Sequence, residues 1–181
     1  MSTTSVEVIV LCEDLQQEYF IRRLLQKRGR QRYDFRPLIS PAGRGSGEQW
    51  VRERFPRELK AHRSQAGRRN TWLIVATDAD TQRVDSRIES FAQACNDAGV
   101  PFRKENERVM FVVPKRNIET WFAYLRGENV NEADTYRKYD FESDCRHDVE
   151  RLDEMCRQQR LAPRPPLSLE YACIEFKRIA N

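Results

Sequence analysis

The sequence predicts an α/β fold, in which a mostly parallel central sheet is flanked by helices and followed by a C-terminal helical annex. Four apolar runs of strand length alternate with segments of helical periodicity, and parallel strands need such long crossover connections. The last third of the chain changes to helical segments separated by a proline-rich break. We therefore expect an α/β core over residues 1–126 and an annex over 127–181, packed together as one compact domain.

The first strand is expected at Val6–Leu11, a short run rich in β-branched residues. A helix should follow, with Asp14 as its N-cap and Gly29 as its stop. A second strand is expected at Tyr33–Ile39. The flexible stretch "SPAGRGSG" then leads to a charged helix from Glu48 to about His62.

The third strand lies in "WLIVATDADTQRV", an apolar run that stops abruptly at two aspartates, and a helix is expected at Asp85–Asn96. The stretch "RVMFVVP" predicts the fourth strand. It leads into "NIETWFAYLRG", a helix for which Asn117 is the expected cap. In the annex, "FESDCRHDVERLDEMCRQQR" and "LSLEYACIEFKRIAN" each predict a helix, separated by "LAPRPP".

Composition restricts the class of protein only in part. The net charge of +4 is the difference between 32 basic and 28 acidic residues, so the total does not argue for a nucleic-acid partner. The five cysteines form no C-x-x-C pair, and we expect reduced, buried, structural thiols and no zinc site. No signal-peptide pattern and no run of about 18 apolar residues is present, so we expect a cytoplasmic protein that does not enter a membrane.

Acidic residues stand where the predicted strands end. Glu13 follows the first strand, Asp78 and Asp80 follow the third, and Glu119 lies in the first turn after the fourth. The carboxyl ends of parallel strands meet at one edge, and oxygen ligands there suit Mg²⁺ or Mn²⁺. Each residue except Glu13 also has an ordinary structural interpretation: turn and capping chemistry for the aspartates, helix-dipole stabilisation for Glu119, and a solvated helix position for Glu18.

Three motifs in order, "CEDLQQEYF", "ATDAD" and "VVPKRNIETWF", resemble the Toprim fold of the OLD-family nucleases and of small stand-alone Toprim-like proteins of bacterial anti-phage systems. The resemblance covers roughly residues 6–126. It implies Mg²⁺-dependent (or Mn²⁺-dependent) phosphodiester hydrolysis at Glu13, Asp78 and Asp80, with an ATPase as a partner protein. It also makes Glu18 the second acidic residue of the first motif, and Glu119 resembles the acidic residue of a late E-x-W motif. The family has glycine where this chain has Asp14. Two interpretations stay open: Asp14 is a harmless helix-cap substitution, or it narrows the room for a phosphate and weakens activity.

The expected site follows from these motifs. The metal ligands would be Glu13, Glu18, Asp78, Asp80 and Glu119, and the catalytic residues would be Glu13, Asp78, Asp80 and Lys115. Lys115 and Arg116 could neutralise charge on a phosphate, or could be a solvated pair in a turn. The remaining nucleic-acid contacts would come from Arg44, Arg52 and Lys60. The segment that holds Arg52 and Lys60 also carries interleaved glutamates, as in a plain solvated helix.

Other classes fit less well. A haloacid-dehalogenase-like phosphatase carries D-x-D-x-T on its first strand, whereas here the motif follows the third strand and Gln82 stands in the fifth place. A primase or topoisomerase would need further domains for which 181 residues leave no room. The main alternative to a nuclease is a non-catalytic Toprim-like module that binds nucleic acid or a partner without cleaving.

Overall fold

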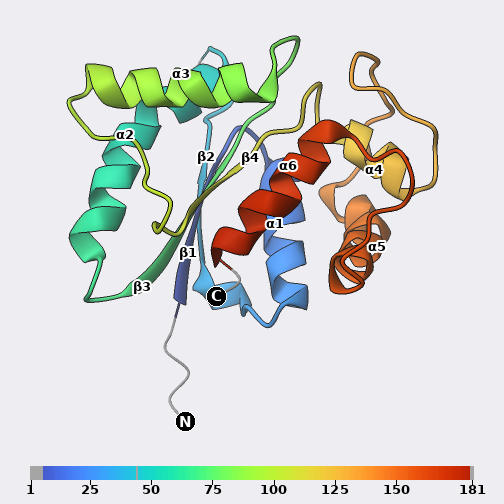
Figure 1. The fold of residues 1–181 in the computed structure, drawn as a ribbon, viewed down its shortest axis with the longest axis horizontal. Helices are drawn as coiled ribbons and strands as arrows, with labels where there is room; N and C mark the ends of the chain where they lie inside the picture. The colour runs from blue at the N-terminus through green and yellow to red at the C-terminus, as the bar shows by residue number, and fades with distance from the viewer. Residues whose placement is uncertain (1–5, 44, 180–181) are drawn as a thin grey trace.

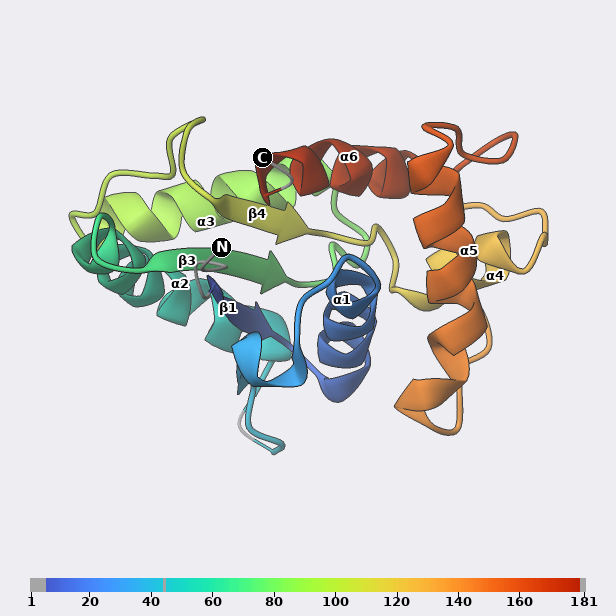
Figure 2. The same ribbon diagram turned by 90° about the horizontal axis from the view of Figure 1, so that it is seen from below.

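The computed structural model describes residues 6–43 and 45–179, and a parallel sheet lies between two layers of helices (Figure 1). The strands of the sheet are β1 (Val6–Cys12), β2 (Phe35–Ile39), β3 (Asn70–Ala76) and β4 (Val109–Val112). Their order is β2-β1-β3-β4 and every neighbouring pair is parallel. Figure 2 shows the arrowheads of β1, β3 and β4 pointing the same way. The predicted parallel α/β fold is confirmed.

Six α-helices connect and cover these strands. They are α1 (Leu15–Lys27), α2 (Gly47–Gln65), α3 (Val84–Asp97), α4 (Glu119–Leu125), α5 (Arg146–Arg157) and α6 (Leu167–Phe176). Three short 3₁₀ turns accompany them, η1 (Arg32–Asp34), η2 (Glu142–Cys145) and η3 (Lys177–Ile179). None of the helices in the described part of the chain has the length and apolar character needed to cross a membrane.

Strands β1, β3 and β4 are largely apolar on both faces because each face of the sheet carries its own core, whereas the edge strand β2 is only half-buried. Alternate residues such as Val8 and Val10 belong to the apolar cluster that α1, α4, α5 and α6 complete, whereas Ile9 and Leu11 belong to the cluster formed with α2 and α3. Figure 1 shows α2 and α3 on one side of the sheet and α1 and α6 on the other. Continuous apolar runs, rather than strict alternation, are therefore what this sheet requires of its sequence.

The predicted caps hold for α1 but not for α4. The Asp14 side chain accepts a hydrogen bond from the Gln17 backbone N–H at 2.9 Å, and Gly29 follows the helix with φ 91°. The prediction of Asn117 as the cap of α4 is wrong, because the helix begins at Glu119 with Ile118 in the cap position and no side-chain capping bond. The chain enters α4 through tight backbone bonds, including one from Trp121 N–H to Ile118 O at 3.0 Å, which shift its start by one residue.

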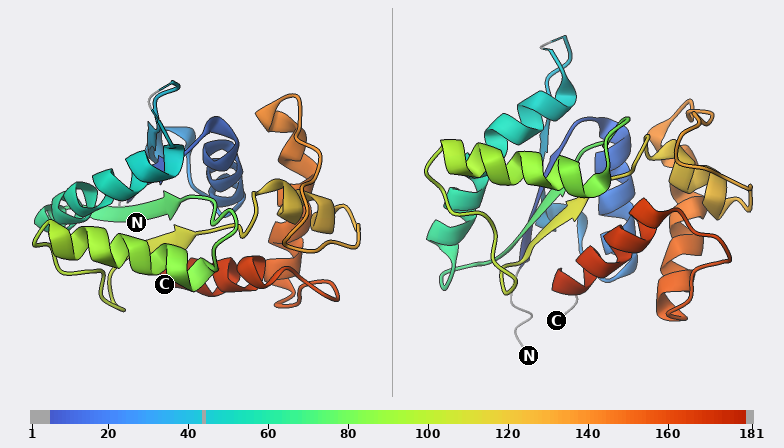
Figure 3. Two further views of the ribbon diagram at one scale, coloured as in Figure 1. Left: turned by 90° about the horizontal axis from the view of Figure 1, so that it is seen from above. Right: turned by 45° about the horizontal axis from the view of Figure 1, so that its top comes forward.

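The annex packs on the core against α1, α4 and β4. Helix α5 lies on the outer side of α1, away from the sheet, in both views of Figure 3. Helix α6 covers the outer edge of β4, where the Glu175 carboxylate accepts the Phe111 backbone N–H at 2.8 Å and forms an ion pair with Arg103. This contact satisfies a backbone group that would otherwise be left open at the sheet edge.

Candidate functional site

The carboxyl ends of β1 and β3 bring Glu13 and Asp78 together. Cys12 and Ala76 are partners in the parallel register, so the residues that follow them leave the sheet side by side. The Asp78 backbone N–H donates to Glu13 Oε1 at 2.7 Å, and the Thr77 hydroxyl donates to the same oxygen. Glu13 is therefore held against the end of β3 through one carboxylate oxygen, and its other oxygen makes no hydrogen bond within the described residues.

Gln17 links the two acidic residues. Its side-chain oxygen accepts the Glu13 backbone N–H at 3.1 Å, and its side-chain nitrogen donates to Asp78 Oδ1 at 3.1 Å. The residue is buried, and its backbone N–H is held by the Asp14 cap. From the sequence, Gln17 was recognisable only as the third residue after that cap. Gln17 lies in the first helical turn after β1. A side-chain amide at such a position can reach the end of a neighbouring strand, and this position is the signal that the sequence contained.

The surroundings disfavour the charged forms of both carboxyls. Burial raises the pKa of Glu13, and Asp14 and Asp80 add to the effect, whereas the hydrogen bonds from Thr77 and Asp78 oppose it. Burial raises the pKa of Asp78 well above its usual range, and the carboxylates of Glu13, Asp14 and Glu119 raise it further. Several like charges thus act on one another at this edge, and a nearby cation would relieve their repulsion.

The amino end of α2 lies against Glu13. A Cβ atom added to Gly47, the first residue of this helix, would stand 3.1 Å from Glu13 Cβ and 3.2 Å from its Oε2. Ser46 caps the helix, and its hydroxyl accepts the Gln49 N–H at 3.4 Å. The helix dipole favours negative charge at this end, which suits a carboxylate or a phosphate.

The structure turns Asp80 away from this pair. The residue has a left-handed backbone, with φ 54°, and its side chain is 65% exposed. Its carboxylate pairs with Arg87 at 3.4 Å, and Arg87 also pairs with Glu48 at 2.9 Å. Asp80 is close enough to raise the pKa of Glu13, but no hydrogen bond joins it to Glu13 or Asp78.

The other two predicted acidic ligands are placed differently. Glu18 forms an ion pair with Arg22, one turn along α1, at 2.7 Å, which is the ordinary structural role of a helix residue. Glu119 is buried in the first turn of α4, and burial raises its pKa. Because Glu119 also raises the pKa of Asp78, it belongs to the acidic surroundings of the site.

The predicted basic contacts fall in separate places. Lys115 and Arg116 are half-buried just after β4, and neither forms an ion pair with any described residue. The backbone bond from Ala79 N–H to Pro114 O, at 2.8 Å, ties their segment to the turn that carries Asp78. The two therefore lie on the same edge of the sheet as the acidic pair.

The basic residues of α2 do not gather at that edge. Arg52 pairs with Glu48 at 2.8 Å, which matches the solvated-helix interpretation. Lys60 is exposed about 20 Å along the helix axis from Gly47, given a rise of about 1.5 Å per residue. Arg44 lies outside the described residues.

The carboxylates at this edge offer few free oxygens to a divalent cation. In the described ranges, no group of three or more His, Cys, Asp or Glu side chains is arranged to hold a metal ion. Glu13 and Asp78 nevertheless each keep one carboxylate oxygen that no described residue hydrogen-bonds. Mg²⁺ is commonly bound by one or two carboxylates, with waters and substrate phosphate completing its shell. The donor set therefore suits Mg²⁺ or Mn²⁺ shared with a phosphate.

The cysteines divide into two groups. All five are free thiols, and Cys12, Cys95 and Cys145 are buried as predicted. Burial raises the pKa of Cys95 to about 11 and that of Cys145 to about 12, so both are poor nucleophiles. The prediction of buried thiols is wrong for Cys156 and Cys173, which are half-buried and line a pocket in the annex.

Fold and site together define an α/β protein with an acidic pair at the carboxyl edge of a parallel sheet. No family model, curated protein or solved structure matches the chain. The functional argument therefore depends on the geometry of this edge and on the motifs of the sequence.

Proposed function

We propose that this protein is a Mg²⁺- or Mn²⁺-dependent, Toprim-like nuclease that hydrolyses phosphodiester bonds of nucleic acid, as a cytoplasmic effector of anti-phage defence beside an ATPase partner. The observation that carries the proposal is the meeting of Glu13 and Asp78 at the ends of adjacent parallel strands, each with an uncommitted oxygen. Open α/β sheets bind their ligands at this edge.

Each residue has a role that follows from its contacts. Glu13 and Asp78 would hold the cation, which when bound polarises the phosphoryl group and acidifies a water. Thr77 and Gln17 fix the orientation of the two carboxylates. Lys115, on the same edge and without an ion pair among the described residues, is placed to offset negative charge on the reacting phosphate.

The amino end of α2 supports phosphate binding in the same place. Backbone N–H groups at a helix start and the helix dipole both favour anions. Gly47 allows the helix start to approach Glu13 closely, since a side chain at this position would contact Glu13. A phosphate beside Glu13 would therefore meet the helix end as well as the cation.

The test is cation-dependent stabilisation together with cleavage. At a Mg²⁺ concentration about 100 times Kd, binding should add about 2.7 kcal/mol to the free energy of unfolding and raise Tm by roughly 5–10 °C. Asp78→Asn should abolish this shift, and Glu13→Gln should remove cleavage of plasmid DNA or total RNA in the presence of the partner. Asp85→Asn is the matched control, because Asp85 is exposed and paired with Arg83 at 2.7 Å. A shift that persists in Asp78→Asn, or that is missing from the unmutated protein, would contradict the proposed metal site.

A second candidate function is a non-catalytic module that binds nucleic acid or a partner. The ion pair between Asp80 and Arg87 favours it, because that pair leaves two rather than three strand-end carboxylates with free oxygens. Such a module should bind nucleic acid without divalent cations, and binding should survive Asp78→Asn. Asp80→Asn tests a different point, whether Asp80 is a cation ligand: its ion pair with Arg87 predicts that the cation-dependent rise in Tm persists in this variant.

A further inference from the structure

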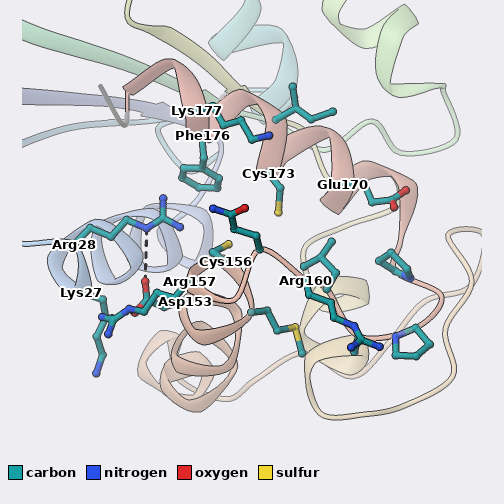
Figure 4. A pocket seen from close by; sticks show the side chains of 17 residues that line it. Lys27, Arg28, Asp153, Cys156, Arg157, Arg160, Glu170, Cys173, Phe176 and Lys177 are labelled. Atoms are coloured by element: carbon teal, nitrogen blue, oxygen red, sulfur yellow. Dashed lines mark ion pairs between the residues drawn. The ribbon is translucent and has the colours of Figure 1, made fainter.

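A pocket of about 1030 Å³ lies in the annex, between the end of α1, helix α5 and helix α6 (Figure 4). Its wall is largely apolar, with Met155, Leu161 and Phe176 among the lining residues. It shares no lining residue with the acidic edge of the sheet. A volume of this size accommodates a small organic molecule.

The charge around the pocket is predominantly positive. Its lining includes five cationic side chains, Lys27, Arg28, Arg157, Arg160 and Lys177, and two acidic ones, Asp153 and Glu170. Asp153 is engaged by Arg28 at 3.6 Å and by Arg157 at 2.8 Å. Arg160 and Lys177 form no ion pair with any described residue, so the pocket favours an anionic ligand.

Two thiols face this space from different helices. Cys156 comes from α5 and Cys173 from α6, and Figure 4 shows their sulfur atoms pointing toward each other in the pocket. The interaction with the neighbouring Cys173 thiol lowers the pKa of Cys156, and the positive charge of Arg28 adds to this effect, whereas burial opposes it. The same interaction, together with burial, raises the pKa of Cys173, which favours Cys156 as the attacking thiol of the pair. Low thiol pKa, access and an adjacent second thiol are the features of reactive cysteines.

We propose that Cys156 and Cys173 are a redox-active pair that exchanges with an anionic low-molecular-weight disulfide bound in this pocket. The Cys156 thiolate attacks one sulfur of the small disulfide, whose S–S bond breaks to release one thiolate. Cys173 then gives up its proton and attacks the Cys156 sulfur, which forms the Cys156–Cys173 bond and releases the second thiolate. The two chain thiols lose two electrons and two protons, and the small disulfide gains them as two thiols.

Oxidised glutathione is the anionic probe, and cystamine, a cationic disulfide, is its counterpart at the same concentration. The full chain is incubated near neutral pH, quenched with acid, alkylated and mapped by mass spectrometry. We expect an intramolecular bond between Cys156 and Cys173, formed faster with oxidised glutathione than with cystamine. Arg28→Gln should reduce that preference. Cys145 is the internal control and should stay unmodified until the protein is denatured, because it is buried.

Single variants separate the two roles. Cys173→Ser should stop the reaction at a mixed disulfide on Cys156, and Cys156→Ser should slow the first step by about tenfold or more. Thermal melting of each variant checks that it is folded.

Three results would overturn the proposal: Cys145 reacting as fast as Cys156, no mixed disulfide in folded Cys173→Ser, or only bonds between two molecules. Equal rates with the two probes would overturn the anionic ligand. The proposal and its tests are independent of the proposed nuclease function.

Discussion

Gly47 is the residue whose side chain, if it had one, would most directly disturb Glu13. A Cβ atom would stand within 3.3 Å of three Glu13 side-chain atoms, closer than ordinary packing permits. We expect Gly47→Ala to displace the Glu13 carboxylate and to weaken Mg²⁺ affinity by about tenfold or more, as the loss of other orienting contacts does. Isothermal titration calorimetry measures the affinity.

Global stability should fall by no more than about 1–3 kcal/mol in Gly47→Ala, the usual cost of overpacking, because the close contacts involve the side chain of one residue, Glu13. Ser64→Ala, at an exposed position near the other end of the same helix, is the control. Unchanged Mg²⁺ affinity in Gly47→Ala would show that Glu13 does not hold the cation.

His62 gives the protein a pH dependence that is separate from the acidic site. It is buried, and its Nδ1 lies 2.9 Å from the Thr71 hydroxyl. Burial lowers its pKa from the usual 6.5; the positive charge of Arg63 adds to this effect, and the negative charge of Glu107 opposes it. A lowered pKa means that the unfolded chain takes up the proton first as pH falls. The contribution of His62 to stability is therefore full above about pH 6.5 and decreases below it.

We expect the difference in unfolding free energy between the unmutated protein and His62→Gln to shrink from about pH 7 to about pH 5. Urea denaturation at several pH values measures that difference. The raised pKa values of Glu13 and Asp78 act on stability in the opposite direction, but they are common to both proteins and cancel in the comparison. A difference that grows as pH falls would contradict the assignment.

At the scale of the elements, Glu175 joins α6 to the edge of the sheet. Its carboxylate accepts the Phe111 N–H and pairs with Arg103, and the two charged side chains are only 4% and 6% exposed. Glu175→Gln leaves Arg103 buried without its counter-charge, so the free energy of unfolding should fall by about 3–5 kcal/mol. Chemical denaturation measures the loss. Glu170→Gln, at an exposed position on the same helix, should cost less than about 0.5 kcal/mol.

The sequence predicted the helices and strands well where an apolar pattern extended over many residues and the element was buried along its whole length. The apolar runs located β1, β3 and β4 because strands covered on both faces tolerate few polar residues, and the shorter run at residues 33–39 located the half-buried β2. The single helix expected over residues 141–160 is shorter, with η2 before α5 and an end at Arg157. Helix ends depend on local backbone bonds that periodicity does not specify.

The site was predictable in location but not in the direction of every side chain. The parallel strands predicted from the sequence place the strand-end carboxylates at one edge, but only the strand order and register of the structure show that Glu13 lies beside Asp78. Residues i and i+2 share one side only while a chain continues as a strand. Strand β3 ends at Ala76, and the left-handed backbone at Asp80 directs its carboxylate to Arg87 instead.

For the whole molecule, oxidation of the annex pocket should change stability without changing the acidic edge. A bond between Cys156 and Cys173 would close a loop of a size that is worth about 3 kcal/mol in the chain-entropy model, or roughly 6–12 °C in Tm. Differential scanning calorimetry of the oxidised and reduced protein tests this. Mg²⁺ affinity should be equal in the two forms, because the pocket shares no residue with Glu13 or Asp78. An oxidised form that melts lower would show that the bond strains the native annex.

The covered edge of β4 also has a consequence for biosynthesis. Phe111 and Glu175 are 64 residues apart, so a nascent chain on the ribosome can complete the sheet long before the residue that covers its edge has been made. During that interval the open edge of β4 can pair with another unfinished chain. A product terminated before α6 should therefore accumulate in inclusion bodies rather than as a soluble protein with one helix missing.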